Sequence, residues 1–239
     1  MTTALLIAIA VAAAAGLMRG FAGVGSGMLM APFFFRLFGP VETVGIIIMM
    51  ELVVTAQLWP SVRREIDWRV IGPMGGVAAL FMPLGSWLLV SLDPKLIGYA
   101  IAVLVIVFSL VLMTGWRYQG PKSLAATLSV GALSGTLMAL TSLGNPPVML
   151  YLLSSSDPAA VNRANFTGYF AVTLVALIAL MAATGLIAWK TVGTVAALLP
   201  LFMLTAWVGS RLFRKSSEAL YRRIALAILF CAGVYGLFQ

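Results

Sequence analysis

The chain has no histidine, a single cysteine and only seven acidic residues among its 239. With Cys231 alone, an internal disulfide is excluded. Without histidine and with few carboxylates, the chain has almost no residues for a catalytic metal cluster or a histidine-based active site. We therefore expect no enzyme, no bound metal and no other cofactor. Charge is scarce as well, at 9% of the residues.

Hydrophobic residues are abundant: they make up 62% of the chain, and the mean hydropathy is +1.07. Apolar runs recur along the whole length, and in lipid such runs span the bilayer as helices. The composition thus predicts an all-α, polytopic integral membrane protein. The net charge of +8 comes from basic residues in short loops. There they set membrane orientation, and they do not indicate nucleic-acid binding.

A polar, glycine-rich stretch from Arg19 to Gly27 interrupts the first apolar run. Each glycine inside a helix costs about 1 kcal/mol relative to alanine, so we expect two short helices that meet at a break. The free N–H groups of the second helix would suit an anion. Close helix packing is the alternative, because spacings such as Gly16 to Gly20 let membrane helices touch. The candidate binding residues of this first break are Arg19, Gly23, Gly25, Ser26 and Gly27.

Further apolar segments follow, and a second break interrupts them. Asp93-Pro94 and Asp157-Pro158 are typical helix starts, because aspartate caps a helix and proline suits its first turn. The N-terminus lacks the basic flank and cleavage site of a signal peptide, so we expect its apolar run to remain. The predicted segments are residues 2–19, 26–37, 39–60, 70–91, 96–114, 123–140, 148–153, 158–183, 191–212 and 217–238, with the second break at 141–147.

Features of residues 1–120 recur in the same order in residues 121–239. We therefore predict two repeats, each a broken segment followed by three transmembrane helices. The matching features are Gly16–Gly20 with Gly131–Gly135, Gly25–Gly27 with Gly144–Pro146, Pro40 with Pro158, Trp68–Gly72 with Trp189–Gly193, and Gly85-Ser86 with Gly209-Ser210.

Loop charge predicts that the repeats are inverted. If each broken segment folds back as a hairpin, eleven of the 15 basic residues fall in cytoplasmic loops. The loop before Trp68 is then inside and the loop before Trp189 outside, with both termini on the non-cytoplasmic side of the cytoplasmic membrane. Inverted repeats with breaks at the midplane are typical of secondary transporters. The alternative is a duplicated membrane protein without a transport role.

The motifs of both halves resemble the sulfite exporter TauE/SafE family, also described as a 4-toluenesulfonate uptake permease family. Two residues depart from the family pattern: Asn145 stands where a second glycine is usual, and Arg19 where a small or apolar residue is expected. The resemblance implies export or uptake of small organosulfur anions such as sulfite or sulfoacetate. It rests on Gly16, Gly20, Gly23, Gly25, Gly27 and Pro32, on Ser134-Gly135, Gly144, Asn145, Pro146 and Pro147, and on Arg163.

Glu51 lies midway along its span, where a charged side chain is costly and therefore a functional candidate. It either takes up a proton that couples transport or serves as a structural partner of Arg19. Arg19 either pairs with a sulfonate, whose oxygens match the guanidinium fork, or acts only as the counter-ion of Glu51. For Arg163, membrane anchoring is the favoured interpretation. The other candidates are Thr141, Ser142, Gly144, Asn145 and Pro146 in the second break, and Gln57, Asn162 and Asn165 nearby.

The sequence thus predicts a secondary transporter that moves a small organosulfur anion across the cytoplasmic membrane by proton-coupled export. The two breaks would hold the anion, and Glu51 would carry the proton. A passive anion channel and a non-transporting assembly protein are the alternatives. We expect an anionic substrate, a proton and membrane lipid as partners, with a homodimer as one option and no nucleic acid.

Overall fold

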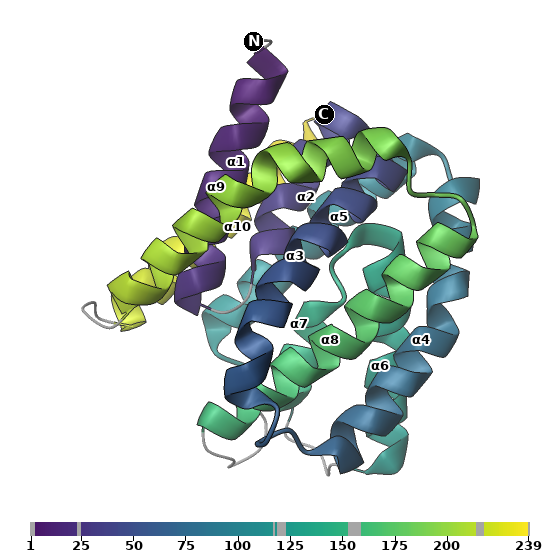
Figure 1. Cartoon of the computed structure of the whole chain (residues 1–239), viewed down its shortest axis with the longest axis vertical. Coiled ribbons are helices and arrows are strands. Elements are labelled where there is room, and N and C mark those ends of the chain that lie inside the picture. Colours follow the sequence, from purple (N-terminus) through teal and green to yellow (C-terminus); the bar gives the residue numbers. More distant parts are fainter. Residues whose placement is uncertain are drawn as a thin grey trace.

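The computed structural model describes residues 3–22, 25–116, 118, 123–152, 159–213 and 218–238. These residues form helices joined by short connections, which confirms the all-α prediction (Figure 1). In chain order the helices are α1 (Thr3–Ala22), α2 (Ser26–Phe38), α3 (Pro40–Val62), α4 (Trp68–Ser91), α5 (Pro94–Thr114), α6 (Leu124–Thr141), α7 (Asn145–Leu152), α8 (Ala159–Ala183), α9 (Trp189–Phe213) and α10 (Glu218–Leu237).

Within the described residues, six helices are long and apolar enough to cross a membrane: α3, α4, α5, α6, α8 and α9. In contrast, α2 has 13 residues and α7 has 8. Both are shorter than the roughly 20 residues that a bilayer core requires. The lengths therefore confirm a polytopic membrane protein that contains short, broken segments.

Local capping explains where several helices begin. Asp93 accepts a hydrogen bond from the Lys95 backbone N–H at 2.7 Å, and Pro94 occupies the first turn of α5. Asp67 caps α4 in the same way through Arg69 N–H, at 3.0 Å. The predicted start at Asp93-Pro94 is confirmed, whereas Asp157-Pro158 lies outside the described residues.

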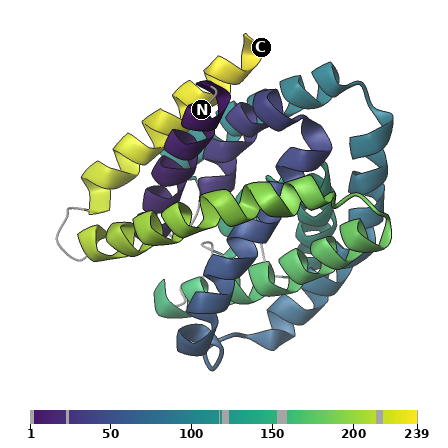
Figure 2. The same cartoon turned by 45° about the horizontal axis from the view of Figure 1, so that its top comes forward.

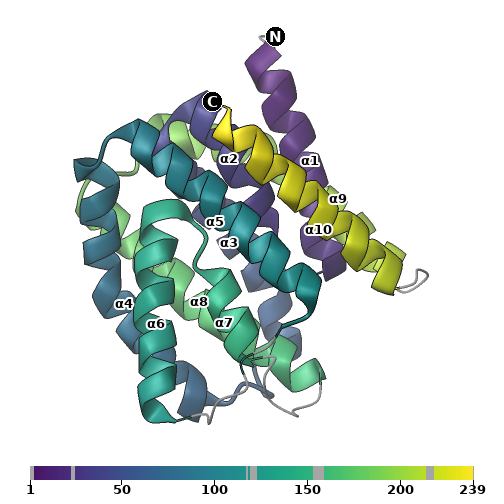
Figure 3. The ribbon, with the colours of Figure 1, turned by 180° about the vertical axis from the view of Figure 1, so that it is seen from behind.

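The two broken segments are hairpins that enter from opposite ends of the molecule. Helix α1 runs from the end that carries both termini toward the middle, and α2 returns to that end (Figures 1 and 3). Helix α6 runs inward from the opposite end of the molecule, and α7 returns toward that opposite end (Figure 3). The loop between α3 and α4 also lies at the opposite end from the loop between α8 and α9 (Figure 1).

The halves exchange helices: α1 packs along α9, and α6 packs along α4 (Figure 2). Glycines allow both contacts. A Cβ added to Gly20 would lie 1.8 Å from the Ala206 carbonyl oxygen, and one added to Gly135 would lie 2.1 Å from that of Ala78. Close packing is therefore the correct interpretation of the Gly16–Gly20 spacing and of its counterpart in α6.

Helix α3 lies inside the bundle, against α2, α8 and α9. Ile46, Ile47, Ile48 and Met50 on this helix are all at most 1% exposed. A helix that is apolar around its whole circumference is one that neighbours cover on every side. Glu51 follows directly after this stretch and is therefore held within the protein interior.

Candidate functional site

The first break separates α1 from α2. Gly25 caps α2 with φ of 94°, a left-handed conformation that favours glycine because glycine has no Cβ. Space is short as well, since an added Cβ would lie 2.3 Å from the Met18 Cε atom. The Gly25 carbonyl then accepts the first hydrogen bond of α2, from Leu29 N–H at 3.0 Å. Gly23, the other glycine predicted here, lies outside the described residues.

Arg19 and Glu51 meet beside this break. The Arg19 Nε and Glu51 Oε2 atoms lie 3.1 Å apart, an ion pair by distance that lacks hydrogen-bond geometry. Ser26, the first residue of α2, donates a hydrogen bond to Glu51 Oε1. Arg19 also donates to Thr55 Oγ1 at 3.3 Å, and its guanidinium carbon lies 5.0 Å from the centre of the Phe170 ring.

All members of this cluster are buried, with Arg19 3% exposed and Glu51 2% exposed. Charges without water require a close opposite charge, because the cost of removing each from water is several kcal/mol. Glu51 supplies that charge for Arg19, and Ser26 occupies the other carboxylate oxygen. The geometry thus makes Arg19 and Glu51 mutual counter-ions in the interior.

The second break comprises residues 142–144, between α6 and α7. We expected it to extend through Pro147, but α7 begins at Asn145, so that prediction was wrong. Proline lacks the N–H that an early helical turn leaves unpaired; Pro146 and Pro147 therefore fit the first turn of α7. Ser142 turns the chain with φ of 63°, and its N–H bonds the Met138 carbonyl at 2.9 Å.

A neutral hydrogen-bonded cluster holds this second break. Ser134 on α6 donates to the Gly144 carbonyl, and the Tyr169 hydroxyl on α8 donates to Ser134 Oγ at 2.7 Å. Ser134 and Tyr169 are at most 1% exposed. Glycine is required at 144, because a Cβ there would lie 2.5 Å from the Ser134 carbonyl oxygen.

The sequence analysis did not identify Ser134 and Tyr169 as site residues, although the internal repeat contains the signal. Ser134 precedes Gly135 as Arg19 precedes Gly20 in the matched motifs. Tyr169 follows Pro158 by the same number of residues as Glu51 follows Pro40. The Arg19–Glu51 pair and the Ser134–Tyr169 pair therefore occupy corresponding sequence positions in the two halves of the chain.

The two breaks lie next to each other inside the bundle. A Cβ added to Gly27 would lie 3.4 Å from the Ser142 carbonyl oxygen and 3.5 Å from Ile47 Cγ2. Ser142 Oγ is buried and has no hydrogen-bond partner among the residues that the structure describes. Thr141 Oγ1, in contrast, donates to the Leu137 carbonyl at 2.8 Å and accepts from Leu143 N–H at 3.3 Å. The structure thus brings residues of both predicted breaks together.

The remaining candidates lie apart from this centre or serve other contacts. Asn165 Oδ1 accepts a hydrogen bond from Asp67 N–H at 2.7 Å, which ties α8 to the loop before α4. Gln57 is exposed and Asn162 is half-buried, whereas Asn145, the first residue of α7, is half-buried directly beside the second break. The side chain of Arg163 lies outside the described part of the chain.

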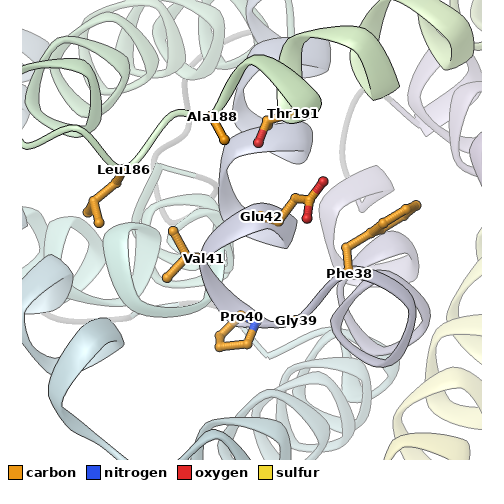
Figure 4. A pocket seen from close by; sticks show the side chains of 8 residues that line it. All are labelled: Phe38, Gly39, Pro40, Val41, Glu42, Leu186, Ala188 and Thr191. Carbon is orange, nitrogen blue, oxygen red and sulfur yellow. The ribbon is translucent and has the colours of Figure 1, made fainter.

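A pocket of about 300 Å³ opens where α2 meets α3, next to the loop before α9 (Figure 4). Its charged residue is Glu42, whose Oε2 atom lies 3.4 Å from Lys190 Nζ. Lys190 is 76% exposed, so water weakens this pair. Neither Glu51 nor any residue of the two breaks lines this pocket.

The fold defines a polytopic membrane protein in which two helical hairpins bring polar breaks together in the interior, an arrangement known from transporters. A family model described as "Sulfite exporter TauE/SafE" matches residues 8–236. The chain therefore belongs to the TauE/SafE sulfite exporter family, a family of membrane transporters, as its motifs suggested. Searches of curated proteins and of solved structures gave no match.

Proposed function

We propose that the protein is a secondary transporter that exports a small organosulfur anion, such as sulfite or a sulfonate, together with a proton. The observation that carries the proposal is the contact of the two breaks at Gly27 and Ser142, beside the buried Arg19–Glu51 pair. Membership of a sulfite exporter family supports the substrate class.

In this proposal the anion binds between the breaks. The Ser142 hydroxyl and the Asn145 amide are neutral donors for its oxygens, whereas the Ser26 and Thr141 hydroxyls can donate to it only after they leave Glu51 and the Leu137 carbonyl. The first turn of α2 adds backbone N–H groups, and the first turn of α7 adds only those of Asn145 and Val148, because Pro146 and Pro147 have none. Gly25, Gly27 and Gly144 lack side chains and let the backbone approach the ligand, and Pro146 shapes the first turn of α7. Ser142 Oγ supports this proposal most directly, since it is buried without a partner among the described residues.

The ion pair suggests how a proton is coupled to the anion. Arg19 has one positive charge, which either Glu51 or a bound anion neutralises. When the anion pairs with Arg19, Glu51 loses its counter-ion. A proton on Glu51 then neutralises its carboxylate, because an uncompensated charge in the membrane interior is costly. One proton and one monovalent anion would then move in the same direction without net charge. A high internal anion concentration would drive both outward.

Burial of the breaks favours a transporter over an open channel. Ser26, Thr141 and Ser142 are each at most 2% exposed. A conducting pore would place such residues in contact with water, whereas alternating access requires a state in which the site is closed. Saturable counter-flow of the anion in liposomes would separate the two mechanisms, because a passive channel shows none.

We also propose that the repeats are inverted across the membrane. The exchange of α1 and α6 between the halves supports this arrangement, as does the position of the two loops at opposite ends. Cysteine at position 68 or 189, in a Cys231→Ser background, is expected to react with an impermeant thiol reagent from opposite sides. Reaction of both positions from the same side would contradict the inversion.

Transport by the purified protein in liposomes tests the function. We expect sulfite or sulfoacetate efflux that rises when the inside is more acidic than the outside. Ser26→Leu and Asn145→Leu should raise the anion concentration for half-maximal rate, whereas Gln57→Leu, an exposed position on the same α3 helix as Glu51, should not. If both leucine variants keep the wild-type affinity, the anion binds elsewhere.

The proton route requires its own variant, because Glu51→Gln alone would leave Arg19 with an uncompensated charge. Arg19→Gln combined with Glu51→Gln keeps the cluster neutral. We expect any transport left in this double variant to be independent of pH. Persistent pH dependence would show that Glu51 does not carry the proton, and a purified protein that moves no anion at all would favour the assembly role.

A further inference from the structure

A second pocket, of about 340 Å³, lies at the end of the molecule where α2 and α10 end and α3 and α5 begin. Two of its lining residues, Arg36 and Lys95, are basic, and both side chains are exposed. Phe35, Tyr99 and three prolines supply most of the remaining wall. None of the residues of the two central breaks lines it, so it is separate from the proposed transport site.

The positive charge of this pocket is not balanced by nearby acids. Neither Arg36 nor Lys95 forms an ion pair with any residue that the structure describes. Asp93 directs its carboxylate to the Lys95 backbone N–H at 2.7 Å, and Glu42 contacts Lys190 at 3.4 Å. No acidic residue lines the pocket itself.

Helix ends do not change this balance. Two helices begin at the pocket and two end there. Because a helix carries about half a positive charge at its start and half a negative charge at its end, these contributions largely cancel. The two whole charges of Arg36 and Lys95 therefore determine what the pocket attracts.

We propose that this pocket binds a tetrahedral oxyanion group, a phosphate or a sulfonate, between Arg36 and Lys95. The Arg36 guanidinium can bond two oxygens of such a group at once, and Lys95 adds a point charge. A pocket of this volume is within the usual range for small ligands. The group comes either from the headgroup of an anionic phospholipid or from a free oxyanion in solution.

The apolar part of the wall favours the lipid source. Tyr99 is 50% exposed, and Phe35 lies beside it on the pocket wall. An aromatic rim of this kind suits the glycerol and the first acyl carbons that follow a headgroup. Basic pockets between membrane helices are a known form of anionic lipid site.

Melting curves of the detergent-purified protein test this proposal and need no transport activity. The probes are phosphatidylglycerol, phosphatidylcholine as a neutral control, and inorganic phosphate. We expect phosphatidylglycerol to raise the melting temperature with saturation, and phosphatidylcholine to have no such effect. Arg36→Gln and Lys95→Gln should each weaken the apparent affinity about fivefold, and the double variant about 25-fold. Arg64→Gln, which removes an exposed cation in the loop after α3, away from this pocket, should leave the affinity unchanged.

The outcomes separate the two sources. Stabilisation by phosphatidylglycerol but not by phosphate identifies a lipid headgroup site, and stabilisation by phosphate as well identifies a free oxyanion site. The proposal is wrong if no probe stabilises the wild type, if phosphatidylcholine acts as strongly as phosphatidylglycerol, or if the double variant binds as the wild type does. An equal loss in Arg64→Gln would also overturn it, because the effect would then reflect general surface charge.

Discussion

Two buried clusters, one beside each break, hold the breaks in place with different chemistry. In the first half, an ion pair between Arg19 and Glu51 joins the hairpin helix α1 to α3, and Ser26 links the break to it. In the second half, a hydrogen bond between Ser134 and Tyr169 joins α6 to α8, and Ser134 also bonds the break carbonyl of Gly144.

The difference between the clusters shows that either charged or neutral partners can hold a break in this fold. A neutral pair is sufficient to hold a broken helix against its neighbour, as Ser134 and Tyr169 do. The charged pair is therefore more than the fold needs, because burying two charges is costly even when they compensate each other. This excess supports our proposal that the first cluster carries the proton and that the second only positions its break.

The largest effect is expected from breaking the charged cluster. Glu51→Gln should lower the free energy of unfolding by about 3–5 kcal/mol, because it leaves Arg19 buried without its counter-charge. Adding Arg19→Gln should recover a large part of this loss. The free energies of unfolding of the single and the double variant are measured by denaturation in mixed detergent micelles. If the two substitutions are simply additive, the pair is not a coupled unit.

An intermediate effect is expected where the halves exchange helices. Gly20→Val and Gly135→Val should each lower the free energy of unfolding by about 1–3 kcal/mol, since the new side chain meets backbone and the helices must separate. Gly72 and Gly193 are matched controls, because a Cβ at either meets no atom within 4 Å among the described residues. Equal losses of unfolding free energy at all four positions would contradict the close approach of α1 to α9 and of α6 to α4.

The smallest effect is expected in the neutral cluster. Tyr169→Phe removes one hydrogen bond and should cost about 0.5–1.5 kcal/mol of unfolding free energy. Ser134→Ala should cost more, because it also leaves the Gly144 carbonyl without its donor. Neither substitution should change the pH profile of transport. A Tyr169→Phe variant with an altered pH profile would place the proton in the second cluster as well.

The sequence predicted those parts of the fold that depend on neighbouring residues. Apolar runs marked the helices, and aspartate and proline placed the start of α5 at Pro94. The predicted start of α2 at Ser26 was correct, since Gly25 takes a left-handed conformation that ends the break, whereas α1 continues to Ala22, past its predicted end at Arg19. The end of the second break was wrong at Pro147, since proline both breaks a helix and begins one.

What the sequence alone determined, then, is an all-helical membrane protein with two broken segments, because these features follow from local composition and spacing. The tertiary structure decided which side chains meet. Glu51 reaches Arg19, and Tyr169 reaches Ser134, only because α3 and α8 pass beside the hairpins with these faces turned inward. Gly27 reaches Ser142 across the two halves. Such contacts depend on the rotation and packing of whole helices, which no short stretch of sequence specifies.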